Sequence, residues 1–284
     1  MHSRVTYRDQ PRPFDPDYDF QSIQFFQTQS LPVYGREAIR LLQTHLGIYL
    51  IQQQEARNRD THQSVPIPNL PADKNPDYVT YMDDFTGIAL DTTNDWTLVK
   101  DSSATAALGA DAESGTLVLT SQATTDNDGA SVQGNEIFAV ATGRNIWFET
   151  KVKVGDSEGS AIELCVGLTV NFATNPENML AATDRIVFQV DDGDANIDCV
   201  TEKDGTATTT DSGVDIADDT YVTLGFHVTD AAKVEFFVNR NLVATHTANI
   251  PDDENLAIGA MELSGSATGT KSATIDYLFA SQTR

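Results

Sequence analysis

The densest group of potential ligand side chains is a run of four acids, Asp191, Asp192, Asp194 and Asp198. Oxygen-rich loops can hold Ca²⁺, which prefers carboxylate and carbonyl ligands. The run lacks the spacing of an EF-hand loop, however, and Asp-Asp-Gly-Asp is also the composition of a hairpin turn. We therefore interpret the segment Asp191–Asp194 as a turn, with calcium binding as the alternative.

Carboxyl pairs that could act on a glycosidic bond are not evident. Such chemistry needs two carboxyl groups in one cleft, which acids at alternate positions of a strand would supply. Glu149 is followed by Thr150 and Lys151, and Glu163 stands alone before an apolar run. We therefore predict no catalytic residues and no enzymatic activity.

Histidine and cysteine offer no metal or nucleophile motif. The five histidines, which are His2, His45, His62, His227 and His246, show neither metal-ligand spacing nor a neighbouring Ser or Cys in a catalytic pattern. Cys165 lies in an apolar run and is typical of a small core residue, with a disulfide to Cys199 as the alternative. No glycine-rich phosphate loop occurs. We expect no metal and no cofactor.

Residues 78–284 show the period-two alternation of β-strands. The alternation is clearest from Trp147 to Val154 and from Tyr221 to Val228. The joints between such segments carry Gly, Asp, Asn and Ser, which favour turns. The candidate strands are 78–84, 116–121, 146–154, 161–170, 185–190, 197–202, 221–229, 233–239, 242–245, 256–263 and 273–280. This pattern predicts an all-β fold with two antiparallel sheets packed as a sandwich.

Trp96, Tyr78 and Tyr81 could stack on sugars or be buried near the sandwich opening, so the ligand is left unknown.

Residues 1–77 have a different character. Closely spaced prolines near the start indicate an extended arm. A proline-rich stretch from 59 to 77, with Pro66, Pro68, Pro71 and Pro76, indicates a stiff linker. The arm carries large apolar side chains that need a surface to lie on, among them Tyr18, Phe20, Phe25 and Phe26.

The stretch from 33 to 58 predicts the one long α-helix of the chain. Pro32 stands at its entry, and basic residues favour its C-terminal end. A 3-4-3 spacing indicates a coiled-coil-like seam formed by Ile39, Leu42, Leu46 and Tyr49. The helix could pack on the sandwich as a lid or be buried between subunits.

The charge of the chain is unevenly distributed. Residues 1–75 hold eight acids and eight bases, whereas residues 76–284 hold 34 acids and 10 bases, so the formal net charge of −24 lies in the second part. Such a surface repels phosphate backbones, so we expect no nucleic-acid partner. It favours solubility among crowded copies, although an origin in a saline habitat would explain it equally well.

No run approaches 18 apolar residues and the N-terminal decapeptide lacks a signal-peptide pattern, so we expect no membrane and a soluble product.

A characteristic order of motifs runs from Asp83 to Ala280. The motifs are Asp83-Asp84-Phe85, Trp96, Gly115–Leu119, Trp147–Lys153, Gly167-Leu168, Asp184–Phe188, Tyr221–Phe226, Lys233–Asn239 and Thr274–Leu278. This order resembles the concanavalin A-like lectin/glucanase jelly roll, in the version with a closing Ile-Asp-Tyr strand found in bacteriophage virion proteins. Glucanases of that fold carry a strand of the type Glu-x-Asp-x-x-Glu, which this sequence lacks.

The resemblance implies a structural protein of a phage particle, assembled in the host cytoplasm. We expect a capsid decoration protein in which residues 1–77 attach to the major capsid protein or another virion protein. The sandwich, residues 78–284, would project outward. Self-association is expected, with a trimer as the closed form. A tail or fibre attachment protein and a free carbohydrate-binding module are the alternatives, with host-surface carbohydrate as a further partner.

Overall fold

The structure is a computed structural model that describes residues 77–101, 103–110, 114–121, 126–155, 162–171, 174–265 and 270–284. The chain divides into two units, Met1–Ala56 and Arg57–Arg284, and all described residues belong to the second. The predicted arm, the helical segment and nearly all of the linker lie outside the described residues.

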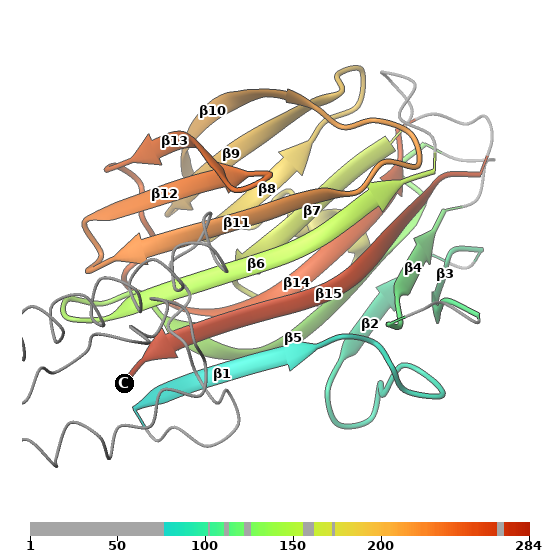
Figure 1. Cartoon of the computed structure of the whole chain (residues 1–284), viewed down its shortest axis with the longest axis horizontal. Coiled ribbons are helices and arrows are strands. Elements are labelled where there is room, and N and C mark those ends of the chain that lie inside the picture. Colours follow the sequence, from blue (N-terminus) through green and yellow to red (C-terminus); the bar gives the residue numbers. More distant parts are fainter. Residues whose placement is uncertain are drawn as a thin grey trace, which may run out of the picture. The chain divides into compact units, whose positions relative to one another are not determined.

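Fifteen strands in the described residues form two antiparallel sheets (Figure 1). Sheet A has the order β13 (Asn241–His246), β12 (Lys233–Val238), β11 (Val222–Thr229), β6 (Asn145–Val154), β15 (Ser272–Thr283), β4 (Leu117–Thr120) and β3 (Thr105–Leu108), and β1 (Tyr78–Asp83) also pairs with β15. Sheet B has the order β10 (Thr206–Asp215), β9 (Asn196–Lys203), β8 (Arg185–Val190), β7 (Ile162–Thr169), β14 (Asn255–Ser264), β5 (Gly129–Ala139) and β2 (Thr97–Lys100). The predicted all-β sandwich is confirmed.

The core lies between the two sheets and follows from the alternation read in the sequence. Inward-facing residues of β6, β8 and β11 are fully buried, and the Phe148 and Phe226 rings stack 4.8 Å apart. Phe188 of sheet B meets Phe236 of sheet A edge to face at 5.3 Å. These contacts join the sheets through apolar burial, the main favourable contribution to folding.

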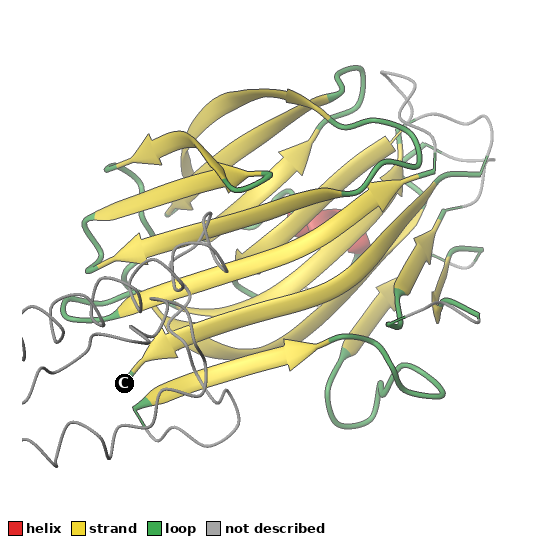
Figure 2. Cartoon of the chain, viewed as in Figure 1, coloured by secondary structure: helices red, strands yellow, loops and turns green. Residues whose placement is uncertain are grey.

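The predicted long α-helix is not borne out by the structure. The residues that the structure describes contain no α-helix, and their one helical element is the 3₁₀ turn η1 (Pro176–Met179), seen in red in Figure 2. The helix predicted over 33–58 falls outside the described part of the chain. In that described part, no helix has the length and apolarity needed to cross a bilayer.

The described chain begins and ends at the same end of the sandwich. The backbone N–H of Arg284 donates to the carbonyl oxygen of Asp77 at 2.9 Å, and Tyr78 pairs with Thr283. We call this the terminal end. The long strands run between this end and the opposite one. We call the opposite end, where Ile162 pairs with Ser264, the far end. The two ends are therefore available for different tasks.

Candidate functional site

The outer face of sheet B carries a second, smaller apolar cluster. Strand register places Cys165 of β7 beside Met261 of β14, and Val187 of β8 beside Val200 of β9. These side chains pack with Leu263 and with Met179 of η1, and all of them are buried. Because η1 contacts β14 and β5, the middle of this face is covered by the β7–β8 connection rather than open.

Local sequence explains why η1 forms there. Pro176 occupies the first position of the turn, where its fixed φ favours a helical start and a missing N–H is harmless. The N–H of Asn178 donates to the carbonyl of Asn175 at 3.1 Å. The turn thus places Met179 against the outer face of sheet B, where its flexible thioether packs among the apolar side chains of that face.

Beside this cluster, Arg185 of β8 forms a buried ion pair. Its Nε donates to Glu202 Oε2 of β9 at 2.7 Å, directly across the strand pair. Its Nη1 donates to Gln189 Oε1 at 2.9 Å and approaches the carbonyl of Met179 at 3.4 Å. A guanidinium so surrounded is a fixed positive charge on the outer face of sheet B.

The far end of the same face is acidic. Register places Glu163 of β7 next to the end of β8, where Leu164 pairs with Val190 and Asp191 follows. Burial raises the pKa of Glu163 to about 7, with further contributions from Asp191 and Asp192. Burial also raises the pKa of Asp198, again with Asp191 as the next cause. We call Glu163, Asp191, Asp192 and Asp198 the far-end acids.

The far-end acids could take part in proton transfer. A carboxyl group whose pKa is about 7 is partly protonated at neutral pH and can give or take a proton. Neighbouring carboxyl groups in different environments are how protein sites divide acid and base roles. Gln189 donates its amide N–H to Asp191 and so fixes the orientation of that carboxyl group.

The structure separates the two acids that the sequence analysis singled out. Glu149 lies on the outer face of sheet A, where the Tyr277 hydroxyl donates to its Oε1 at 2.6 Å. Glu163 lies on the outer face of sheet B. Since the two sheets and the core stand between them, Glu149 and Glu163 do not form a pair.

The remaining candidate residues have ordinary placements. Asp191–Asp194 forms the β8–β9 turn, in which the N–H of Asp194 donates to the carbonyl of Asp191 at 3.2 Å. Cys165 and Cys199 are both buried and free, and they belong to different apolar clusters, so no disulfide joins them. Trp96 is buried and donates its Nε1–H to Asp83 Oδ2 at 2.8 Å. Among the described residues, no group of three or more His, Cys, Asp or Glu side chains is placed to hold a metal ion.

The predicted anchor residues lie outside the described part of the chain. They are Tyr18, Phe20, Phe25, Phe26, Ile39, Leu42, Leu46 and Tyr49. Sequence reasoning, for its part, missed the Arg185–Glu202 pair and the position of Met179. Arg185 and Glu202 both lie in strands that the sequence predicts, but which two strands pair could not be read from the chain alone.

Comparison with known proteins establishes the fold. No family model matches the sequence, and no curated protein matches it either. Among solved structures, an endo-1,3-β-glucanase from Streptomyces sioyaensis is 12% identical with a TM-score of 0.53, covering 76% of this chain and 99% of its own. A GH16 protein of the Bacteroides ovatus mixed-linkage glucan locus, solved with a G4G4G3G product, is 13% identical with a TM-score of 0.52, covering 70% and 98%. A Shewanella oneidensis protein of unknown function is 17% identical with a TM-score of 0.51, covering 72% and 87%.

This likeness confirms the concanavalin A-like jelly roll and corrects one prediction. We expected a chain without enzymatic activity because no strand carries Glu-x-Asp-x-x-Glu. We correct that prediction, because the similar structures include an endo-1,3-β-glucanase and a GH16 protein, so the fold is one that also occurs in glucan-degrading enzymes. The missing motif on one strand was too narrow a criterion, since it overlooked acids that register brings together from neighbouring strands, such as Glu163 and Asp191. The expected phage context has no counterpart among these structures.

Proposed function

We propose that the chain is a structural protein of a bacteriophage particle, with capsid decoration as the specific role. Residues 1–77 would attach to the major capsid protein or another virion protein, and the sandwich would project outward. The observation that supports this division is that residue 77 enters the sandwich at its terminal end, next to Arg284. An anchor joined there leaves the far end pointing away from the particle.

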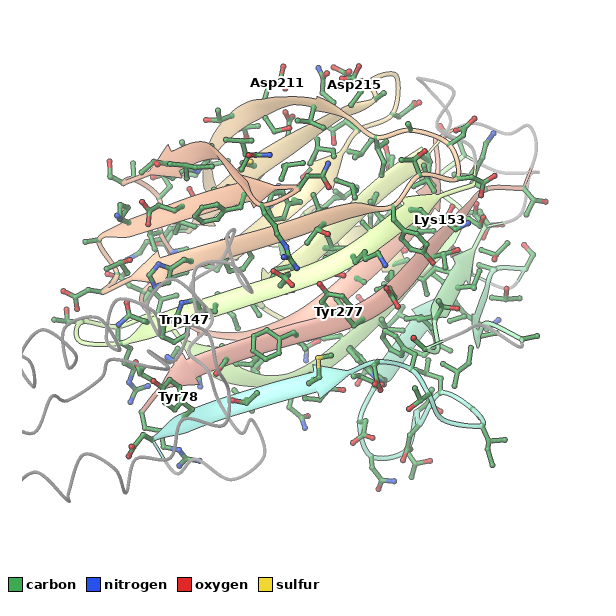
Figure 3. The ribbon with its side chains drawn as sticks, in the orientation of Figure 1. Tyr78, Trp147, Lys153, Asp211, Asp215 and Tyr277 are labelled. Atoms are coloured by element: carbon green, nitrogen blue, oxygen red, sulfur yellow. The ribbon has the colours of Figure 1, made fainter. Side chains whose placement is uncertain are left out.

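The acidic charge of the sandwich supports an exposed position on a crowded particle. All of the net charge of −24 lies after residue 75. The far end carries Glu163, the β8–β9 turn and neighbouring acids. Like charges on the outer ends of many copies repel one another, which keeps a crowded particle surface soluble. In Figure 3, Asp211 and Asp215 mark the acidic outer edge of sheet B at β10.

An epitope tag tests the orientation on the particle itself. Inserting it at Gly193, in the far-end turn, and at Gly143, in the β5–β6 turn of the terminal end, gives a matched pair, because a side chain at either glycine would meet no atom within 4 Å. We expect antibody to bind intact particles that carry the Gly193 tag and to bind the Gly143 tag far less. Equal labelling, or no incorporation into particles, would contradict the proposal. If gold-labelled antibody bound at the tail rather than the head in electron micrographs, the tail or fibre alternative would be favoured.

A second candidate function is glycan binding or cleavage at the outer face of sheet B. The observation that favours it is Glu163, with its pKa of about 7, beside Asp191 in a fold shared with glucan hydrolases. Cleavage of a mixed-linkage β-glucan by the full chain, lost in Glu163→Gln and kept in Glu254→Gln, would support it. Glu254 is an exposed acid and serves as the control. Turnover that is unchanged in Glu163→Gln would exclude this site.

A further inference from the structure

The outer face of sheet A bears a cluster of aromatic side chains that we call the aromatic face: Tyr78, Trp147, Phe237, Tyr277 and Phe279. Register places these residues on one surface, since Trp147 pairs with Ser281 and Phe279 pairs with Glu149. Tyr78, Trp147 and Tyr277 lie on the side of the sandwich turned toward the viewer in Figure 3. Although they point away from the core, Trp147 is 7% and Phe279 is 8% exposed.

Two buried polar atoms on this face have no hydrogen-bond partner among the described residues. They are the Nε1–H of Trp147 and the Nε2 of His227, whose rings stack at 5.2 Å. The other tryptophan of the chain does not share this property, since Trp96 donates to Asp83. A buried donor without an acceptor is destabilising by roughly 1 to 3 kcal/mol, so such atoms call for a partner.

The proline-rich stretch that precedes β1 has the right chemistry for this face. It leads directly into Tyr78, whose ring lies 6.2 Å from that of Trp147. It contains Pro66, Pro68, Pro71 and Pro76. A polyproline II segment makes no internal hydrogen bonds, so its carbonyl groups are free to accept one. Such segments dock on aromatic surfaces at a low cost in conformational entropy, because their backbone is already extended before binding.

We propose that residues 65–76 of this same chain bind across the aromatic face in polyproline II conformation, with a backbone carbonyl of the segment accepting the Trp147 Nε1–H. The face spans four strand spacings from β1 to β12, about 19 Å. Twelve residues of polyproline II reach about 37 Å, which is ample for the crossing. The linker would then be fixed to the sandwich, and the direction in which the attachment region leaves it would be defined. This inference is independent of the particle proposed above.

Hydrogen exchange of the two indole N–H groups, followed by NMR on the full chain, tests this proposal. In the wild type we expect both indole protons to be protected. Replacing Pro66, Pro68 and Pro71 together with alanine should accelerate exchange at Trp147 by about tenfold or more, while Trp96 stays unchanged as the internal reference. The matched control replaces three prolines of the arm, Pro11, Pro13 and Pro16, and should leave both indoles unchanged.

Three results would overturn the proposal. One is unchanged exchange at Trp147 in the linker variant, and another is faster exchange in the arm control. The third is exchange that depends on protein concentration, which would assign the covering segment to a second copy. A second measurement uses trypsin cleavage after Lys74. Trp147→Phe, which keeps an aromatic ring and removes the N–H donor, should speed that cleavage without changing the far-UV circular dichroism. Cleavage at the wild-type rate would count against the proposed hydrogen bond.

Discussion

Glu262 of β14 is the most deeply buried carboxyl group that the described residues place between the sheets. It accepts a hydrogen bond from the Ser121 hydroxyl at 2.8 Å, whereas its Oε2 and the Oδ1 of Asp128 have no partner among those residues. Burial raises its pKa to about 8, with Asp128 raising it further while Ser121 and Lys271 lower it. The side chain is therefore held mostly neutral at pH 7.

This residue gives the stability of the fold a defined pH dependence. Between pH 4.5 and about 8 the native chain keeps a proton on Glu262 that the unfolded chain has released. The native state binds more protons in that window, so the free energy of unfolding falls as the pH rises through it, by up to about 5 kcal/mol.

We predict that Glu262→Gln, which is neutral at every pH, matches the wild type at pH 4.5 and is more stable than it at pH 8.5. Thermal unfolding at both pH values measures this difference. The exposed Glu254→Gln should run parallel to the wild type. If Glu262→Gln also ran parallel, the side chain would already be ionised in the folded protein.

At the scale of elements, the sequence predicted the strands with regular apolar alternation and missed those without it. Eleven candidate segments correspond to strands of the structure within three residues at either end. The strands missed were β2, β3, β5 and β10. β5 begins Gly-Ala-Ser-Val-Gln-Gly, and β10 is mostly threonine and other polar residues. These segments become strands because they pair with neighbouring strands. Local β-propensity does not predict that tertiary effect.

The candidate site was less predictable than the fold for a related reason. Alternation tells which residues share a face of one strand, but register across strands decides which faces combine. Glu163 and Asp191 are 28 positions apart and become neighbours through the β7–β8 pairing. Met179 lies in a loop whose course over sheet B has no periodic signal.

The backbones of β7 and β8 approach each other closely at Gly167. A Cβ added at Gly167 would lie 2.3 Å from the carbonyl oxygen of Ile186 and 2.7 Å from Val187 Cα. Because both are backbone atoms of a central strand, we predict that Gly167→Ala lowers the free energy of unfolding by about 3 kcal/mol or more.

Gly193→Ala is the matched control for that substitution. Its φ of +87° disfavours a side chain, yet no atom lies within 4 Å of the added Cβ. It should therefore lower the stability by only about 1 kcal/mol. Urea unfolding of both variants measures the difference, and equal losses would mean that β7 and β8 can separate to admit a methyl group.

At the scale of the whole molecule, the proposal assigns self-association to the predicted seam of residues 39–49. Burial of one leucine side chain contributes on the order of 2 kcal/mol. Leu42→Asp combined with Leu46→Asp should therefore dissociate a trimer, while Arg36→Asp combined with Arg40→Asp, off the seam, should not. Light scattering measures the mass, and an unchanged mass in the Leu42/Leu46 variant would mean that these leucines pack elsewhere.

We propose that the N-terminal region attaches the chain to the particle and that the far end of the sandwich does not. The most direct test adds full-length variants to phage particles that lack this protein and measures the bound copies by quantitative mass spectrometry. With Tyr18, Phe20, Phe25 and Phe26 changed to serine, we expect binding to fall at least tenfold, because aromatic anchors dominate interfaces. With Asp191, Asp192 and Asp194 changed to asparagine, we expect wild-type binding. Full binding by the first variant, or loss of binding in the second, would place the contact on the sandwich instead of the N-terminal region.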